Sequence, residues 1–325
     1  MAPSLRHILD LGYIITALLR NDSIRAIAER ETERLGIPVS RNTIIGVSRD
    51  IRNGRLRPPS FDPLTYSFGR ERDNGGIPVF DGQVTIEGSV IIINDVHLPF
   101  TNYDLAQRVV DVAGYYDITT MVIAGDLLDM DSQSTFKRKV RSVPLAQEID
   151  AARELLAYYA QHFTRIWVMP GNHEERLLKH LDGELTFDLF TDLIRPPDPE
   201  LVDVFMFTPY DQITIDSGGH EYMVVHQRNS SAISLKIGES LAWKYQKNMI
   251  VTHQHNSAKG YDKYGRYLII DSGGLHNQKR TPYMGLKTST GPVHDEGFVT
   301  VVNGWAELWV PDERYTQWSR LYGAA

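Results

Sequence analysis

The chain has 325 residues, of which 42% are hydrophobic and 23% are charged, a composition typical of a globular protein. It contains no cysteine, which excludes disulfides, zinc–thiolate sites and cysteine nucleophiles and favours a cytoplasmic location. Its net charge of −7 is unevenly distributed, because residues 1–60 carry ten Arg and six acidic residues and are therefore basic, whereas the remainder is acidic. This asymmetry indicates two modules with different partners.

The N-terminal segment, residues 1–57, is predicted to be a small all-α domain. Its apolar run at residues 11–19 is too short to cross a bilayer and lacks a signal-peptide cleavage site, so we expect an amphipathic helix and no membrane partner. Ser23 is the candidate N-cap of a second helix over residues 24–35, with its buried side at Ile24, Ala26, Ile27 and Leu35. After a break at residues 36–39, Ser40 caps a third helix over residues 41–51.

The second helix, the turn with Gly36 and the Arg-bearing third helix together resemble a helix-turn-helix DNA-binding domain. The resemblance implies that the third helix reaches base edges and phosphates, with candidate nucleic-acid contacts at Arg41, Asn42, Thr43 and Arg49. Such modules often act in pairs, which is compatible with a homodimer. The alternative is a three-helix module for dimerisation or protein docking.

Residues 58–83 are rich in Pro and Gly and are predicted to be a linker. From residue 84 to 325, short β-branched runs first alternate with helical stretches and then follow one another. Strands are expected at residues 90–94, 121–124, 166–169, 214–215, 222–225, 248–252, 267–271 and 298–302, and helices at 104–114, 145–162, 174–181 and 232–245. This order predicts an α/β domain built as a two-sheet β-sandwich flanked by helices.

Polar residues follow the ends of five expected strands: Asp95 and His97, Asp126 and Asp129, Asn172 and His173, His226, and His253 and His255. The carboxyl ends of strands in such sheets are where loops converge to form sites. Asp, Asn and His side chains are suitable ligands for divalent cations. Alternation along an extended strand end would place Asp95 and His97 on one side, and His253 and His255 likewise.

The complete order of these motifs, Asp-x-His, Gly-Asp-x-x-Asp, Gly-Asn-His-Glu, His and His-x-His, resembles the calcineurin-like metallophosphoesterase superfamily over residues 86–275. A single motif of this kind carries little information, whereas five in order at strand ends are specific. One position departs from the pattern, because Thr252 stands where the family has Gly before His-x-His. A side chain there would narrow the approach to one metal.

The resemblance implies two divalent metal ions. Mn²⁺ or a similar divalent ion is expected, because a ligand set of oxygen and nitrogen without sulfur does not select one metal strongly. It assigns Asp95, His97 and His255 to the first metal, Asn172, His226 and His253 to the second, and Asp126 to both. Two such cations would activate a shared water for in-line attack on phosphorus.

The same resemblance implies catalytic roles for two further side chains. His173 would protonate the leaving alkoxide as general acid. Asp129 would orient His173 and favour its protonated form; the alternative for Asp129 is a carboxylate at a helix N-terminus.

The substrate class is indicated by neighbouring residues. Met130 and Asp131 stand where protein serine/threonine phosphatases of the superfamily have Arg-Gly, which disfavours that subclass. Candidate phosphate contacts are Arg176, Arg228 and the basic run with Lys137, Arg138 and Lys139, whose alternative is a solvated basic face. In these features the chain resembles the DNA-repair nucleases of the superfamily more than its protein phosphatases.

Three hypotheses follow. The leading one is a phosphodiesterase acting on DNA and recruited by its N-terminal domain. The second is a phosphatase or a hydrolase of small phosphodiesters, such as cyclic or dinucleoside phosphates, with the head as a dimerisation module. The third is a DNA-binding regulatory or assembly protein with a vestigial phosphoesterase fold, which the complete ligand set disfavours.

Overall fold

The computed structural model describes residues 9, 13–14, 17–18, 22–52, 84–134, 142–180, 187–285 and 294–311. The chain divides into two compact units, Met1–Gly82 and Gln83–Ala325, here called the N-terminal and the C-terminal unit. The linker predicted at 58–83 lies outside the described residues, and so do the candidate phosphate contacts Lys137, Arg138 and Lys139. Among the described residues, no helix combines the length and apolar character that a membrane span requires.

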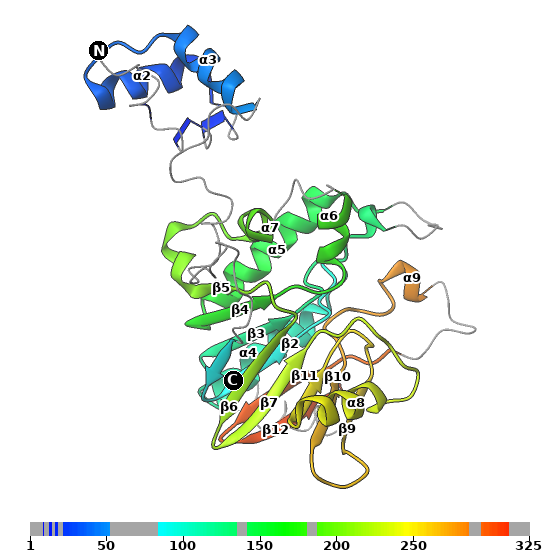
Figure 1. Ribbon diagram of the computed structural model, residues 1–325. Coiled ribbons are helices and arrows are strands. Elements are labelled where there is room, and N and C mark those ends of the chain that lie inside the picture. The colour runs from blue at the N-terminus through cyan, green and yellow to red at the C-terminus, as the bar shows by residue number, and fades with distance from the viewer. Residues whose placement is uncertain are drawn as a thin grey trace. The chain divides into compact units, whose positions relative to one another are not determined.

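The N-terminal unit contains α2 (Ile24–Leu35) and α3 (Arg41–Arg52), close to the predicted bounds (Figure 1). Ser23 caps α2 by accepting a hydrogen bond from the backbone N–H of Ala26 (3.1 Å), and Gly36 ends it with a φ of 67°. Ala26 is exposed, and the expectation that it is buried was wrong, because the apolar stripe of α2 runs through the next two residues. The buried cluster of this unit consists of Leu9, Ile14, Ala17, Ile27, Ala28, Val39, Ile44 and Val47.

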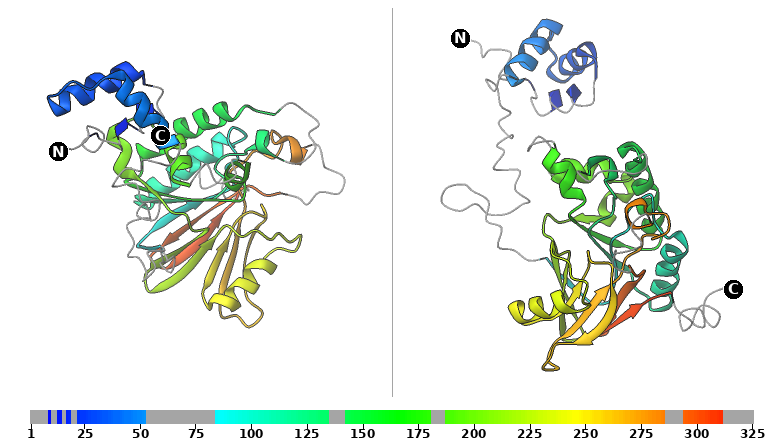
Figure 2. Two further views of the ribbon diagram at one scale, coloured as in Figure 1. Left: turned by 45° about the horizontal axis from the view of Figure 1, so that its top comes forward. Right: turned by 90° about the vertical axis from the view of Figure 1, so that its right-hand side faces the viewer.

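The C-terminal unit contains two mixed sheets, as the sequence predicted, and each sheet has six strands (Figures 1 and 2). The first sheet has the order β1 (Thr85–Glu87), β6 (Gln212–Ser217), β7 (His220–Val225), β8 (Asn248–Val251), β10 (Leu268–Ser272) and β9 (Ser257–Tyr261). The second has the order β12 (Trp305–Trp309), β11 (Phe298–Val302), β2 (Val90–Ile93), β3 (Thr120–Ala124), β4 (Arg165–Met169) and β5 (Phe205–Phe207).

The strands β2, β3 and β4 are parallel, and so are β7, β8 and β10. Their carboxyl ends therefore lead into loops at one end of each sheet. This is the edge at which the predicted site residues occur.

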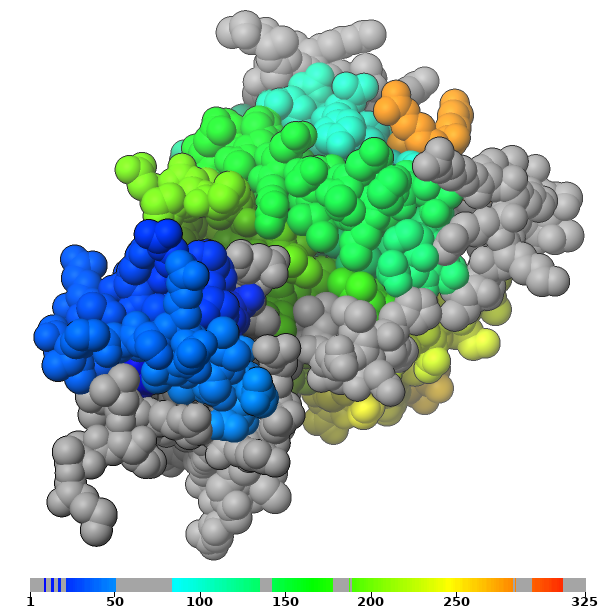
Figure 3. Space-filling view, turned by 90° about the horizontal axis from the view of Figure 1, so that it is seen from above, coloured from blue at the N-terminus to red at the C-terminus, as the bar shows by residue number. Residues whose placement is uncertain are grey.

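Helices cover both outer faces of this sandwich, as Figure 2 shows from two further directions. The larger group belongs to the second sheet and consists of α4 (Tyr103–Tyr115), α5 (Leu145–Ala160), α6 (Glu174–His180), α7 (Phe187–Ile194) and the 3-10 helices η2 (Asp131–Gln133) and η3 (Pro199–Val204). The green atoms of the α5–α7 region form a broad surface in the space-filling view (Figure 3). On the first sheet lies α8 (Lys236–Tyr245), and α9 (Pro282–Gly285) is a single turn.

The helix α8 begins later than predicted. Leu235 has a φ of 65°, a left-handed conformation that interrupts the expected helix over 232–245. The backbone N–H of Leu235 donates instead to the buried carboxylate of Asp271 (2.7 Å).

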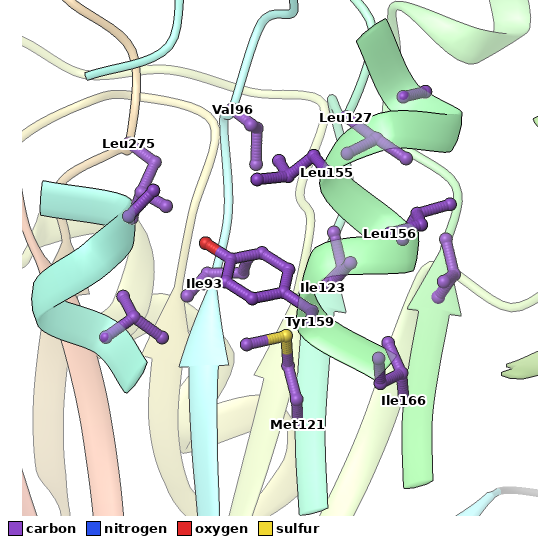
Figure 4. Close-up of a cluster of buried hydrophobic side chains, with 14 of the residues drawn as sticks. Ile93, Val96, Met121, Ile123, Leu127, Leu155, Leu156, Tyr159, Ile166 and Leu275 are labelled. Atoms are coloured by element: carbon purple, nitrogen blue, oxygen red, sulfur yellow. The ribbon is translucent and has the colours of Figure 1, made fainter. Parts of the chain in front are cut away.

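The period-2 alternation of the central strands divides the interior into layers. In β2, Ile91 and Ile93 pack under the helices, whereas Val90 and Ile92 pack between the sheets. The ring of Tyr159, from α5, lies against Ile93 and Met121 in the helix-covered layer (Figure 4). Central strands are therefore apolar on both faces, which holds their carboxyl ends in fixed positions.

A buried carboxylate of α5 supports the loop that follows β3. Glu148 has no exposed surface, and its Oε2 accepts a hydrogen bond from the backbone N–H of Met130 (2.7 Å). Met130 has a φ of 50°, so this contact helps to hold an unfavourable backbone conformation. Burial raises the pKa of Glu148 from 4.5 to about 8.

Replacing Glu148 by Gln should change the pH dependence of stability. The folded carboxyl group keeps its proton up to about pH 8, whereas the unfolded one loses it near pH 4.5, so the folded state is penalised progressively as the pH rises between these values. Urea unfolding at pH 5 and pH 8 measures the effect. Between these pH values, the free energy of unfolding of the variant should rise by at least about 1 kcal/mol relative to that of the wild type. The exposed Glu154→Gln on the same helix is the control, and parallel pH profiles for all three proteins would contradict this account.

Candidate metal and phosphoester site

The predicted ligands lie in the loops that follow the parallel strands, and both sheets contribute. Asp95 and His97 follow β2, and Asp126 follows β3. The histidines from the first sheet follow β7 and β8. Seven side chains separated by up to 160 positions are thereby brought together: Asp95, His97, Asp126, Asn172, His226, His253 and His255.

The directions of these side chains are set by left-handed backbone turns. They are not set by alternation along a strand, which the sequence suggested. β2 ends at Ile93, so the Asp-x-His motif lies beyond the strand. Five of the seven residues have a positive φ: Asp95 (46°), His97 (48°), Asp126 (51°), His253 (66°) and His255 (55°). Non-glycine residues in this conformation cost roughly 1–3 kcal/mol each and cluster at functional sites.

The first group of donor atoms comes from Asp95, His97 and His255. Oδ1 of Asp95 lies 2.9 Å from Nε2 of His255 and 3.7 Å from Nε2 of His97. The two Nε2 atoms are 3.2 Å apart. One carboxylate oxygen and two imidazole nitrogens therefore converge on one point, in the combination assigned to the first metal.

The second group comes from Asp126, Asn172, His226 and His253. Nε2 of His226 lies 3.2 Å from Oδ1 of Asn172 and 3.4 Å from Oδ2 of Asp126. Ring nitrogens of His226 and His253 and a carboxylate oxygen of Asp126 all lie within 4.8 Å of one another. Asp126 also groups with His97, so it stands between the two sets.

The surroundings of the Asp126 carboxylate indicate whether cations fit at this site. It is fully buried, and its Oδ2 has no hydrogen-bond partner among the described residues. A buried carboxylate oxygen without a partner is unfavourable, and a bound cation would satisfy it. The donor set and this oxygen fit a pair of divalent cations.

The outer nitrogens of the imidazoles are held by further groups. Nδ1 of His97 lies 3.0 Å from Oδ1 of Asp129, and Nδ1 of His226 lies 2.9 Å from the carbonyl oxygen of Ala124. The hydroxyl of Thr252 is 2.8 Å from the same Nδ1 of His226, so this departure from the family pattern helps to orient a ligand. Contacts of this kind orient the two rings so that Nε2 of each faces the other donor atoms of its group.

The charges within the cluster are balanced between carboxylates and imidazoles. Burial would raise the pKa of Asp126, but the adjoining imidazoles hold it well below its usual value. Burial would lower the pKa of His97 and His226. Hydrogen bonds to the carboxylates of Asp129 and Asp95 nevertheless raise the pKa of His97 to about 10, and the negative charge of Asp126 raises that of His226 to about 10. Protons on these rings thus compensate the carboxylates, and divalent cations would displace them on binding.

The expected pairing of Asp129 with His173 takes a different form. The carboxylate of Asp129 binds His97, and it is 3.8 Å from Nδ1 of His173. His173 instead contacts the main-chain carbonyl oxygen of Asp129 through Nδ1 (2.6 Å). Burial lowers the pKa of His173 to about 3. The carboxylate of Asp129 therefore hydrogen-bonds to a metal-ligand candidate, whereas the hydrogen bond to His173 comes from the main-chain oxygen of Asp129.

The candidate phosphate contacts differ in position. Arg176 is partly buried beside the cluster, and its Nη2 lies 2.7 Å from Nε2 of His173. Arg228 is exposed and forms an ion pair with Glu175 (2.5 Å). In the N-terminal unit, Arg41, Asn42 and Arg49 are exposed, whereas the hydroxyl of Thr43 lies 2.8 Å from that of Ser40 and belongs to the cap of α3.

Glu174 is a supporting residue to which the sequence analysis assigned no role. It is buried, and its carboxylate accepts hydrogen bonds from the backbone N–H groups of Asp126 (3.1 Å), Leu128 (3.1 Å) and Gly171 (2.8 Å). It therefore joins the loops after β3 and β4. Its place in the Gly-Asn-His-Glu motif was the available signal.

Three more residues that adjoin the site could not be recognised from motif spacing. Asn94 donates to Oδ2 of Asp95 (2.5 Å) and to the carbonyl oxygen of Gly273 (2.6 Å). His294 places Nδ1 3.1 Å from Nδ1 of His255. His276 lies against the first ligand group.

A family model of the calcineurin-like phosphoesterases matches residues 88–276, more than half of the chain. The chain therefore belongs to the calcineurin-like phosphoesterase family, whose members are metal-dependent phosphoesterases. The matched segment includes all seven residues of the two donor groups.

No curated protein gives a significant sequence match. Solved structures similar to this chain include an uncharacterized protein of Streptococcus pneumoniae described as a predicted phosphoesterase (10% identity, 69% of this chain and 97% of that chain, TM-score 0.30). Vacuolar Protein Sorting 29 from Cryptosporidium parvum is another (13%, 68% and 95%, TM-score 0.34). Vps29 from Entamoeba histolytica, complexed with zinc, is a third (11%, 68% and 97%, TM-score 0.34). Family membership rests on the matched family model and not on these distant structures.

Gly171→Ala should weaken metal binding, because a Cβ at this position would overlap the backbone nitrogen and Oδ1 of Asp126. Displacement of Asp126 should lower the affinity for Mn²⁺ at least about tenfold in calorimetry. Gly114→Ala is the matched control, since a Cβ there meets open space on α4. Equal affinities in the two variants would show that the close approach of these loops is not required.

Proposed function

We propose that the protein is a dinuclear-metal phosphodiesterase that hydrolyses DNA and that its N-terminal unit recruits the substrate. The observation that carries the chemical part is the meeting of seven oxygen- and nitrogen-bearing side chains in two adjoining groups, with the buried carboxylate of Asp126 between them. The first cation would be held by Asp95, His97 and His255, the second by Asn172, His226 and His253, with Asp126 contacting both. Mn²⁺ is the proposed metal.

Divalent cations bound there would lower the pKa of an attacking water and neutralise the oxygens of the phosphoryl group. The protein's contribution is to hold the ligands rigidly. Asp129 and the carbonyl oxygen of Ala124 fix the rings of His97 and His226, so the ligands need little reorganisation when metal binds.

His173 is the proposed general acid. In the structure Nδ1 faces the carbonyl oxygen of Asp129, and Nε2 faces the guanidinium of Arg176, so the ring is neutral with its lone pair on Nε2. A phosphate oxygen would draw Arg176 away, and its negative charge would raise the pKa of His173. The proton then held on Nε2 can be transferred to the leaving oxygen.

The exposed face of α3 supports a nucleic-acid substrate. Arg41, Ile45 and Arg49 are spaced four residues apart, so they lie along one side of the helix, and all three are exposed. Asn42, also exposed, adjoins this side. Two guanidinium groups, an amide and an apolar side chain are suited to phosphate, base-edge and thymine-methyl contacts respectively.

The full-length protein with Mn²⁺ should hydrolyse bis-p-nitrophenyl phosphate and should cleave plasmid or single-stranded DNA. Asp126→Asn, which keeps the volume of the side chain but weakens metal binding, should abolish both activities while circular dichroism stays unchanged. Hydrolysis of the small diester without cleavage of any DNA would favour a small-phosphodiester hydrolase. Salt-sensitive DNA binding without hydrolysis of either substrate would favour a regulatory protein.

The double variant Arg41→Ala/Arg49→Ala should weaken DNA binding about tenfold or more and reduce the slope of log K against log salt by about 2, because each phosphate contact contributes about 1. Turnover of bis-p-nitrophenyl phosphate should stay within about twofold of the wild type, since neither Arg belongs to the metal cluster. Lys236→Ala/Lys263→Ala, which removes the same charge from exposed positions of the C-terminal unit, is the control. Equal salt slopes in both double variants would refute recruitment through α3.

A further inference from the structure

A third imidazole adjoins the first ligand group. His276 follows β10 and has no exposed surface. One of its ring nitrogens lies within 4.8 Å of ring nitrogens of both His97 and His255. Its ring centroid is 4.3 Å from that of His255 and 5.4 Å from that of His97.

The hydrogen bonds of His276 leave one nitrogen without a partner. Nδ1 lies 3.3 Å from the main-chain carbonyl oxygen of Asp95, which can only accept, so Nδ1 carries the proton. Nε2 then carries the free lone pair, and it is buried with no hydrogen-bond partner in the described part of the chain. A metal-ligating histidine usually donates its other N–H to a carbonyl or carboxylate oxygen in this way.

The backbone around His276 is tied to the loop of Asp95. The backbone N–H of His276 also donates to the carbonyl oxygen of Asp95 (3.1 Å). A Cβ at Gly274 would lie 2.7 Å from Nδ1 of His276 and 3.0 Å from Cβ of Asp95, so only glycine permits this approach. The position of His276 is therefore set together with that of a metal-ligand candidate.

We propose that His276 is an additional ligand of the cation held by Asp95, His97 and His255. The inference rests on the metal centre of the proposed function and goes beyond the ligands that the family pattern assigns. Three imidazoles at the first position, against two at the second, make the first position richer in nitrogen. Nitrogen ligands favour Co²⁺ and Zn²⁺ over Mn²⁺, so the two positions differ in metal preference.

Substitutions at 276 separate a ligand from a packing residue. His276→Phe keeps an aromatic ring against His255 but has no lone pair, whereas His276→Asp supplies a metal-binding oxygen and loses the ring. Ligation predicts that Phe lowers the affinity of one Co²⁺ position at least about tenfold and that Asp retains more of it. Packing alone predicts the reverse order.

Calorimetry and the visible absorption of bound Co²⁺ measure these effects without reference to activity. In the wild type we expect two Co²⁺ per chain; in His276→Phe the tighter position should weaken, its absorption should change, and its preference for Co²⁺ over Mn²⁺ should fall. His162→Phe, at an exposed position, is the control for a surface substitution. An unchanged affinity and spectrum in His276→Phe overturns the assignment. Absence of Co²⁺ binding in the wild type instead overturns the metal centre itself.

A crystal of the wild-type protein loaded with Co²⁺ gives a check that does not depend on the folding of a variant. A metal within about 2.3 Å of Nε2 of His276 is the expected result, since metal–imidazole bonds are about 2.0–2.1 Å long for the similar ion Zn²⁺. A metal bound by Asp95, His97 and His255 but beyond about 3 Å from His276 overturns the inference and leaves the proposed function intact.

Discussion

Two fully buried carboxylates, those of Asp95 and Asp126, impose the constraint on which the rest of the C-terminal unit depends. A carboxylate without water needs donors or positive charge around it. Asp126 accepts the backbone N–H of His173 at 2.8 Å, and Asp95 accepts that of His253 at 2.9 Å. These acceptors thus join loops from strands far apart in the chain, and the imidazoles around them supply positive charge that metal ions can replace. The loops at the carboxyl ends of the strands are therefore arranged so that donors and positive charge surround these two carboxylates.

The geometry around these carboxylates is maintained at some cost in backbone free energy. Left-handed residues in the ligand loops persist only where the surroundings leave no alternative. The central strands, buried on both faces, and Glu174, which accepts three backbone N–H groups from two loops, provide such surroundings. The rigidity of the sandwich is therefore part of the site, because it holds the donor atoms close together before a metal ion binds.

The distribution of charge is consistent with a division of labour between the two units. Outside the first 60 residues the chain is acidic, which by itself would repel a polyanion. Metal ions and Arg176 would provide local positive charge at the catalytic edge. The arginines on the exposed side of α3 would provide the longer-range attraction under the proposed function. An enzyme for small diesters would have less need of such a basic head.

The sequence by itself determined the eight interior strands and the residues at their carboxyl ends. Each interior strand is buried on one or both faces, so its sequence contains a recognisable apolar run. The pattern did not reveal the four strands at the edges of the two sheets, β1, β5, β9 and β12. Edge strands are short or partly exposed here; β9 (Ser257–Tyr261) carries Lys and Gly and has no apolar run to recognise.

Only the tertiary structure decided how the site residues are paired. Motif order placed Asp129 beside His173, but the left-handed turn at His97 directs that ring to the carboxylate of Asp129. His276 belongs to no expected motif, and it reaches the cluster because β10 lies parallel to β8 and Gly274 permits close approach to Asp95. Local sequence specifies strands and loops through periodicity. The direction of a side chain beyond a strand end depends on backbone turns and on neighbours that only folding brings together.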